Sequence, residues 1–224
     1  MSHPAEHDIL HSWQLNARPW IAAVREGQIK SRVELTNQAI VEVVTGLSPQ
    51  SLLDVGCGEG WLVRALADQG IACLGVDMIP ELIAAAEQAG GGRFRQLSYA
   101  ETSFAHLQES FDVAVCNFSL IGKESVEQLF QQIPALLNPG GAFIIQTLHP
   151  VYGRGAWPYK DGWQEGSWAG FDQAFSQPAP WYFRTLESWQ ELFENSGLGL
   201  REIIEPRKTA TDQPLSVIFV GSPA

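Results

Sequence analysis

Basic residues and cysteines are scarce in this chain. It has 14 Lys and Arg against 25 Asp and Glu among 224 residues, so its formal net charge is −11. Binding to nucleic acid or to an anionic membrane needs clustered Lys and Arg that displace counterions, and we expect neither partner. The three cysteines, Cys57, Cys73 and Cys116, show no CxxC spacing. Their odd number favours reduced thiols over a disulfide framework, and no zinc site is expected.

Long apolar runs are also missing. No stretch approaches the ~20 residues of a membrane span, and the N-terminal MSHPAEHDIL is polar and acidic, unlike a signal-peptide core. We expect a cytoplasmic protein that is a monomer or a homodimer. The 45% hydrophobic content is that of a globular protein, and the length suits one compact unit.

A regular alternation of short β-rich runs and helical patterns begins at residue 51. It predicts an α/β fold in which a mostly parallel sheet lies between two layers of helices. Strands are predicted at residues 51–55, 72–77, 93–97, 111–116, 142–147, 200–204 and 215–220. Helices are predicted at residues 61–69, 80–88, 124–137 and 185–196, with two or three more between residues 4 and 45.

The stretch LLDVGCGEG, residues 52–60, contains the end of the first predicted strand and the loop after it. Gly56, Gly58 and Gly60 permit positive φ and let the backbone lie against a ligand, and the next helix points its N-terminal amides at the same place. Asp54 stands two residues before the first glycine. A carboxylate there repels a pyrophosphate but suits a ligand with an ammonium group and a sulfonium. The GxGxG spacing also differs from the GxGxxG of dinucleotide-binding enzymes.

This motif resembles that of the class I S-adenosylmethionine-dependent methyltransferases of the small-molecule type (type 11/12-like), where D-x-G-x-G-x-G forms the methionine side of the cofactor site. Three later stretches resemble the family's second, fourth and fifth strands: GVDMIP at 75–80, FDVAVCNFSL at 111–120 and LNPGGAFII at 137–145. The resemblance implies a Rossmann-like seven-stranded sheet whose last strand is antiparallel. It also implies S-adenosylmethionine as cofactor and S-adenosylhomocysteine as product, with Asp77 binding the ribose hydroxyls and Met78 covering adenine. No metal is expected.

One position departs from the family pattern. After its third strand the family usually places an acid that bonds the adenine amino group, and this chain reads Ser98-Tyr99-Ala100-Glu101. Tyr99 either stacks on adenine or hydrogen-bonds to it through its hydroxyl. Alternatively, the backbone of Ala100 and the side chain of Glu101 take over the recognition.

The other predicted cofactor contacts lie mainly at the carboxyl ends of the strands, where open α/β sheets bind ligands. Arg32 precedes an amphipathic helix and is expected to reach the methionine carboxylate or an acidic substrate group, with a surface salt bridge as the alternative. Asn117 and Phe118 either contact the cofactor or simply end the fourth strand. The full predicted set is Arg32, Asp54, Gly56, Cys57, Gly58, Asp77, Met78, Tyr99, Ala100, Asn117 and Phe118.

Histidines supply the candidate base. His149 in TLHP follows the fifth predicted strand and is the predicted catalytic residue, because an imidazole titrates near neutrality. The alternatives are a histidine that caps the strand, and a reaction that proceeds by alignment alone. His3, His7 and His11 share one helical face at a spacing that can bind a metal, but a fraying terminus is the commoner outcome and no metal site is predicted.

Aromatic residues are concentrated after the fifth predicted strand. Ten of them fall among many Gly and Pro within residues 151–183, which predicts a lid insertion above the acceptor site. Tyr152, Trp157 and Trp168, with Trp20 from the N-terminal helices, are the predicted substrate-binding residues. The alternative is a small satellite core of buried rings.

Together these patterns predict an N-terminal helical cap at residues 1–48 and a methyltransferase domain at residues 49–224, folded as one unit. The expected reaction transfers the cofactor methyl to an oxygen, nitrogen or carbon of a small-molecule acceptor. Two rivals stay open: a non-catalytic S-adenosylmethionine-binding sensor or partner subunit, and a nicotinamide-dependent oxidoreductase. The second rival is disfavoured by Asp54 and by the glycine spacing.

Overall fold

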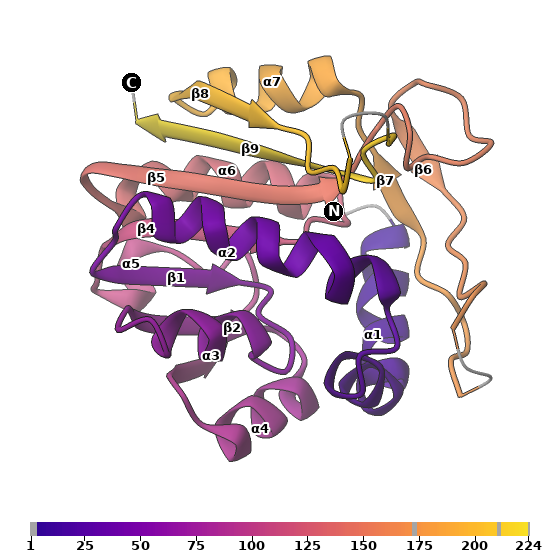
Figure 1. Cartoon of the computed structure of the whole chain (residues 1–224), viewed down its shortest axis with the longest axis horizontal. Coiled ribbons are helices and arrows are strands. Elements are labelled where there is room, and N and C mark those ends of the chain that lie inside the picture. The colour runs from indigo at the N-terminus through magenta and orange to yellow at the C-terminus, as the bar shows by residue number, and fades with distance from the viewer. Residues whose placement is uncertain (1–3, 172–173, 210–211, 224) are drawn as a thin grey trace.

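The computed structural model of this chain describes residues 4–171, 174–209 and 212–223. A seven-stranded sheet runs through it in the order β3-β2-β1-β4-β5-β9-β8 (Figure 1). Strands β1 to β5 pair in parallel, and β9 runs antiparallel to both β5 and β8. The predicted Rossmann-like architecture, with an antiparallel last strand, is therefore confirmed. The strands are β1 (Ser51–Val55), β2 (Ala72–Asp77), β3 (Arg93–Gln96), β4 (Phe111–Asn117), β5 (Leu137–Leu148), β8 (Leu198–Ile204) and β9 (Ser216–Pro223).

Helices cover both faces of the sheet (Figure 1). Helices α2 (Asn37–Gly46) and α3 (Trp61–Ala67) pack on one face, and α6 (Glu124–Leu136) and α7 (Leu186–Asn195) pack on the other. The side chains of β4 alternate accordingly: Val113 and Val115 join the core under α2 and α3, while Ala114 and Cys116 join the core under α6 and α7. Because both faces are buried, the central strands read as nearly continuous apolar runs.

The N-terminal segment covers the end of the sheet to which the parallel strands point (Figure 1). It consists of α1 (Pro4–Arg25), the π-helix η1 (Arg32–Thr36) and then α2, in agreement with the two or three helices predicted. α1 packs its apolar face against α4 (Pro80–Ala89) and the residue before it, through Ala17, Ile79 and Leu82. Among the described residues, no helix combines the length and the apolar composition that a membrane crossing requires.

The fifth strand begins earlier than predicted. Leu137 already pairs with Phe111, and pairing resumes at Ala142 with Val113, so residues 138–141 bulge out of β5 instead of forming a turn before it. The bulge is held by polar contacts, because the Asn138 amide nitrogen donates to Asp112 Oδ1 at 2.8 Å. The predicted helix at residues 124–137 correspondingly ends at Leu136.

The aromatic stretch contains regular structure that its sequence did not predict. β6 (Gly162–Gln164) and β7 (Trp181–Phe183) form a separate two-stranded antiparallel sheet. Trp163 pairs with Tyr182 across it, with ring centroids 5.4 Å apart. A short helix, α5 (Phe104–Leu107), completes the described elements and lies between β3 and β4.

Candidate cofactor site

A cavity of about 390 Å³ lies at the carboxyl ends of β1, β2 and β4, beneath α1. Its size is within the range of small-molecule and cofactor pockets. Ten of the eleven predicted cofactor residues line it, and Asp54 is the exception. Trp20 is the one predicted substrate residue on its wall. The cavity thus brings together predicted residues that are up to about a hundred positions apart in sequence, from Trp20 to Phe118. The lining residues that were predicted are Trp20, Arg32, Gly56, Cys57, Gly58, Asp77, Met78, Tyr99, Ala100, Asn117 and Phe118.

The glycine loop is clamped between β2 and the segment after β4. The amides of Gly56 and Cys57 both donate to the carbonyl of Val76, at 2.8 and 3.0 Å. Gly56 has φ +74°, and a Cβ there would lie only 2.4 Å from the Ser119 Cβ. Any larger residue at position 56 would thus be strained in its backbone and would also push Ser119 away.

Asp77 joins the tip of β2 to this loop. Its Oδ2 accepts a hydrogen bond from the Gly58 amide at 2.9 Å, and its Oδ1 accepts one from the Ile79 amide at 2.9 Å. Burial raises the pKa of Asp77, and the backbone hydrogen bonds oppose that rise. Because each carboxylate oxygen can accept a second hydrogen bond, Asp77 is placed at the cavity wall with capacity for two ligand hydroxyls.

Asp54 is the most unusual group at the site. It lies on β1 opposite Gly75, is only 2% exposed, and its carboxylate has no hydrogen bond or ion pair within the described ranges. Burial, followed by repulsion from Asp77, raises its pKa from 3.8 to about 7, against the attraction of Arg32. A buried carboxylate without a partner is costly, so this position favours a cationic ligand nearby.

Arg32 supplies the opposite charge. It begins the π-helix η1 and lies between Trp20 and Trp61, with its guanidinium carbon 5.6 and 5.1 Å from the two ring centroids. Burial lowers its pKa to about 10, against the attraction of Glu59 and Asp54. Its Nε donates to Asn37 Oδ1 at 3.3 Å, which leaves its terminal nitrogens able to bind an anionic group in the cavity.

The Tyr99 hydroxyl is engaged as a donor and keeps its capacity to accept a hydrogen bond. The hydroxyl donates to the Ser119 carbonyl at 2.7 Å, and burial raises its pKa well above 10. Glu101 is occupied too, since its Oε2 accepts hydrogen bonds from the amide and the hydroxyl of Ser98. Of the alternatives for adenine recognition, Tyr99 and Ala100 line the cavity and Glu101 does not. The Asn117 Oδ1 is also buried there without a partner among the described residues.

His149 lies away from this cavity. It is 1% exposed, its Nδ1 faces the amides of Val151 and Tyr152 at 3.1 and 3.4 Å, and its Nε2 lies 3.0 Å from Glu205 Oε1. Two amide donors at Nδ1 place the proton on Nε2, where Glu205 accepts it. Both nitrogens are thus engaged, which favours the strand-capping alternative over the predicted base.

The other predicted substrate residues also lie outside the cavity wall. Trp157 packs on Trp181 with centroids 5.0 Å apart, and Tyr152 packs on His149 at 4.9 Å. Trp168 packs edge-on against Trp13 of α1 at 5.8 Å. These rings therefore pack on other aromatic side chains instead of lining the cavity, and Trp168 supports α1.

The cavity wall that the sequence reasoning missed comes from the first half of α1. Glu6, Leu10 and Trp13 line the cavity together with Trp20. With Ala17 they form one stripe at alternating spacings of four and three residues, which is the pattern of a single helix face. That pattern was readable in the sequence, but it did not reveal which surface the face covers.

The three N-terminal histidines are only partly within the described residues. Across residues 4–171, 174–209 and 212–223 there is no group of three or more His, Cys, Asp or Glu side chains that could hold an ion. His3 lies outside the described residues. His7 lines the cavity.

The order and directions of the seven strands are those of the class I S-adenosylmethionine-dependent methyltransferase fold. The chain matches the methyltransferase domain family over residues 29–203, and it belongs to that family. It is 31% identical over 112 residues to the ubiquinone biosynthesis O-methyltransferase of Haemophilus ducreyi, covering 46% of this chain and 48% of that protein. The chain thus spans about half the length of the curated relatives it matches.

Solved structures share the fold. An S-adenosylmethionine-dependent methyltransferase from Mesorhizobium loti superposes with a TM-score of 0.62 at 23% identity, covering 81% of this chain and 97% of that one. The DhpI-SAM-HEP complex superposes with a TM-score of 0.68 at 14% identity, over 100% of both chains.

We expect Asp54→Asn to remove a pH dependence from the stability of the ligand-free protein. The pKa of Asp54 is raised from 3.8 to about 7 in the fold, so the folded state favours its protonated form. The stabilisation from this group is complete below about pH 4 and is lost as the pH rises through 7, by at most about 4 kcal/mol. Thermal unfolding between pH 5 and 8 measures this, and an equally steep decline in both proteins would contradict it.

We expect His149→Gln to lower the free energy of unfolding by about 1–3 kcal/mol, because it disturbs buried hydrogen bonds. The dissociation constant for S-adenosylhomocysteine should stay within about twofold of the wild-type value, since His149 does not touch the cavity. Thermal denaturation and calorimetric titration measure the two effects. A tenfold loss of affinity in a folded variant would show that His149 acts on the cofactor site.

Proposed function

We propose that this chain transfers a methyl group from S-adenosylmethionine to an oxygen, nitrogen or carbon of a small-molecule acceptor. The observation that carries the proposal is the arrangement of charges around one cavity: the unpartnered carboxylate of Asp54, the carboxylate of Asp77 and the buried guanidinium of Arg32. That set matches a ligand with a cationic amino-acid end, a carboxylate and a ribose.

In this proposal each group has one task. Asp54 attracts the ammonium group of the cofactor, Arg32 binds the carboxylate, and Asp77 accepts hydrogen bonds from both ribose hydroxyls. When bound, the cofactor supplies an electrophilic methyl group on a sulfonium. The protein then has to align the acceptor and exclude water, which are major sources of rate for such a transfer.

Space for an acceptor is proposed between the first half of α1 and the start of α6. Ile9, Leu10 and Ile121 give this part of the cavity apolar walls, and His7 and Gln128 add polar groups. We propose His7 as the group that takes the proton of a hydroxyl or amine acceptor, in place of His149. Nucleic acid is disfavoured as acceptor by the acidic charge, and a cytoplasmic monomer or homodimer stays a prediction.

The proposed activity is tested by incubating the protein with S-adenosylmethionine carrying a radioactive methyl group and with fractionated metabolite pools. We expect the wild-type protein to transfer the label to a small-molecule fraction and the Asp77→Asn variant to lose this transfer. Tight cofactor binding with no transfer to any fraction would instead favour the sensor or partner-subunit alternative. Binding of a nicotinamide dinucleotide with no binding of S-adenosylhomocysteine would overturn the proposal.

We expect Asp77→Asn to weaken the binding of S-adenosylhomocysteine by about ten- to a hundredfold. Hydrogen bonds to a charged group contribute about 1.5–3 kcal/mol, and the amide loses the charge while keeping one acceptor. Asp68→Asn is the matched control, because Asp68 is exposed just after α3. Calorimetric titration measures both variants, and equal affinity in Asp77→Asn and Asp68→Asn would refute the ribose role.

A further inference from the structure

The segment Ile121–Ser125 runs from the loop after β4 into the first turn of α6 and forms one wall of the cavity. Its carbonyls are held by β7 and the residue after it. The Tyr182 amide donates to the Ile121 carbonyl at 2.7 Å. Arg184 Nη1 donates to the Gly122 carbonyl at 2.9 Å, and its Nη2 donates to the Lys123 carbonyl at 3.1 Å. Three consecutive carbonyls are therefore fixed from the side of the aromatic stretch.

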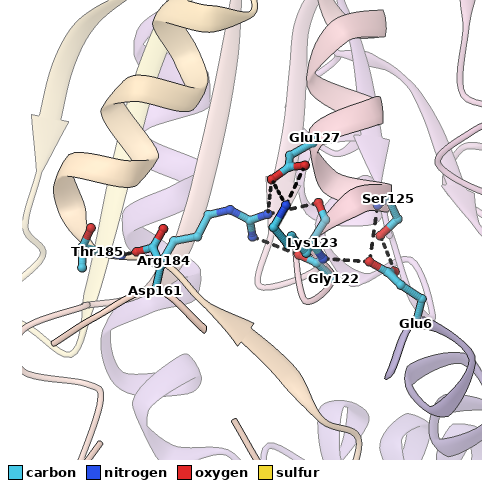
Figure 2. A network of polar contacts seen from close by, with 8 residues as sticks. All are labelled: Glu6, Gly122, Lys123, Ser125, Glu127, Asp161, Arg184 and Thr185. Atoms are coloured by element: carbon cyan, nitrogen blue, oxygen red, sulfur yellow. Dashed lines mark hydrogen bonds and ion pairs between the residues drawn. The ribbon is translucent and has the colours of Figure 1, made fainter. Parts of the chain in front are cut away.

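The amides of the same segment are held from the other side by α1 (Figure 2). Glu6 Oε1 accepts hydrogen bonds from the amides of Lys123 and Ser125 at 2.8 and 3.4 Å, and its Oε2 accepts one from the Ser125 hydroxyl at 2.7 Å. The approach is close enough to restrict position 122, since a Cβ on Gly122 would lie 2.5 Å from Glu6 Oε2. A carboxylate at this helix start also complements the helix dipole of α6.

The Arg184 contacts and the Glu6 contacts differ in how deeply the two side chains are buried. Arg184 is 3% exposed and its guanidinium carbon lies 4.8 and 5.1 Å from the ring centroids of Tyr182 and Trp189. Moving Arg184 would thus break a buried cluster. Glu6, by contrast, is only part-buried and stands near the start of α1, whose face covers the cavity.

Other polar contacts of α1 lie farther along the helix, where Ser12 and Asn16 bond to residues 176–177 and Arg25 bonds to Glu59. Arg18 pairs with Glu81 at 2.6 Å, but its side chain is 86% exposed, and exposed pairs of this kind contribute little. The Glu6 contacts are more buried than the Arg18–Glu81 pair, and they tie the first turn of α1 to the start of α6.

We propose that Glu6 is a positioning residue that latches α1 over the cavity, with Arg184 holding the receiving segment Ile121–Ser125 in place. Closing the latch completes the wall around the cavity that holds cofactor and acceptor, and opening it lets the ligand leave. Such closure sequesters a reaction from water and often limits turnover. This proposal rests on the cofactor placement proposed above.

The test is the dissociation rate of S-adenosylhomocysteine from the full chain, followed by the fluorescence of the tryptophans at the cavity. Glu6→Gln keeps the shape but loses the charge and one acceptor, so dissociation should be about tenfold faster. Ser125→Ala should be faster by a smaller factor. The double variant should be no faster than Glu6→Gln alone, because the two side chains act through one contact.

Arg18→Gln is the matched control, since it also removes a polar contact of α1 but an exposed one, and its dissociation rate should stay within about twofold of wild type. Wild-type dissociation in Glu6→Gln, with only a lower unfolding temperature, would overturn the latch and leave Glu6 as a helix cap. Should Glu6→Gln fail to fold, the dissociation rates of Glu6→Asp and Ser125→Ala are compared with those of the wild type and Arg18→Gln instead. If the wild-type protein does not bind S-adenosylhomocysteine at all, the proposed function itself fails.

Discussion

The structure depends on an imbalance of buried charge at the end of β1 and β2. Asp54 is buried, Asp77 is half-buried beside it, and the cation Arg32 attracts Asp54. Burial and mutual repulsion leave Asp54 with a pKa of about 7 in the ligand-free fold. A ligand that brings positive charge relieves this repulsion, so the same arrangement that costs stability in the free protein favours binding of a cationic cofactor.

Three further features of the fold enclose this site: the glycine loop, the N-terminal segment and the aromatic rings after β5. The glycine loop packs against Ser119 so closely that position 56 has no room for a side chain. Two parts of the N-terminal segment line the cavity, namely Arg32 of η1 and the side chains on one face of α1. Aromatic rings after β5 support α1 from outside, through the contact of Trp168 with Trp13. Part of the aromatic surplus thus packs against the helix that covers the cavity.

Local signals in the sequence predicted most of the sheet and the part of the cavity wall formed by the glycine loop and the strand ends, because these residues lie close to the motifs that reveal them. Tertiary partners were not predictable in the same way. The sequence predicts His149 as a base, but its Nε2 faces Glu205, which lies 56 residues later in the chain. Leu137 looked helical, but pairing with Phe111 placed it in β5. The role of α1 likewise depends on a helix face meeting a segment more than a hundred residues away.

The charge imbalance is tested most directly by counting protons when the ligand binds. Calorimetric titration with S-adenosylmethionine at pH 6, in buffers of different ionisation enthalpy, measures the protons exchanged. Since Asp54 is largely protonated at that pH and must ionise beside the cationic ligand, release approaching one proton per cofactor is expected, and Asp54→Asn should release far less. Tight binding without proton release in the wild-type protein would contradict the account.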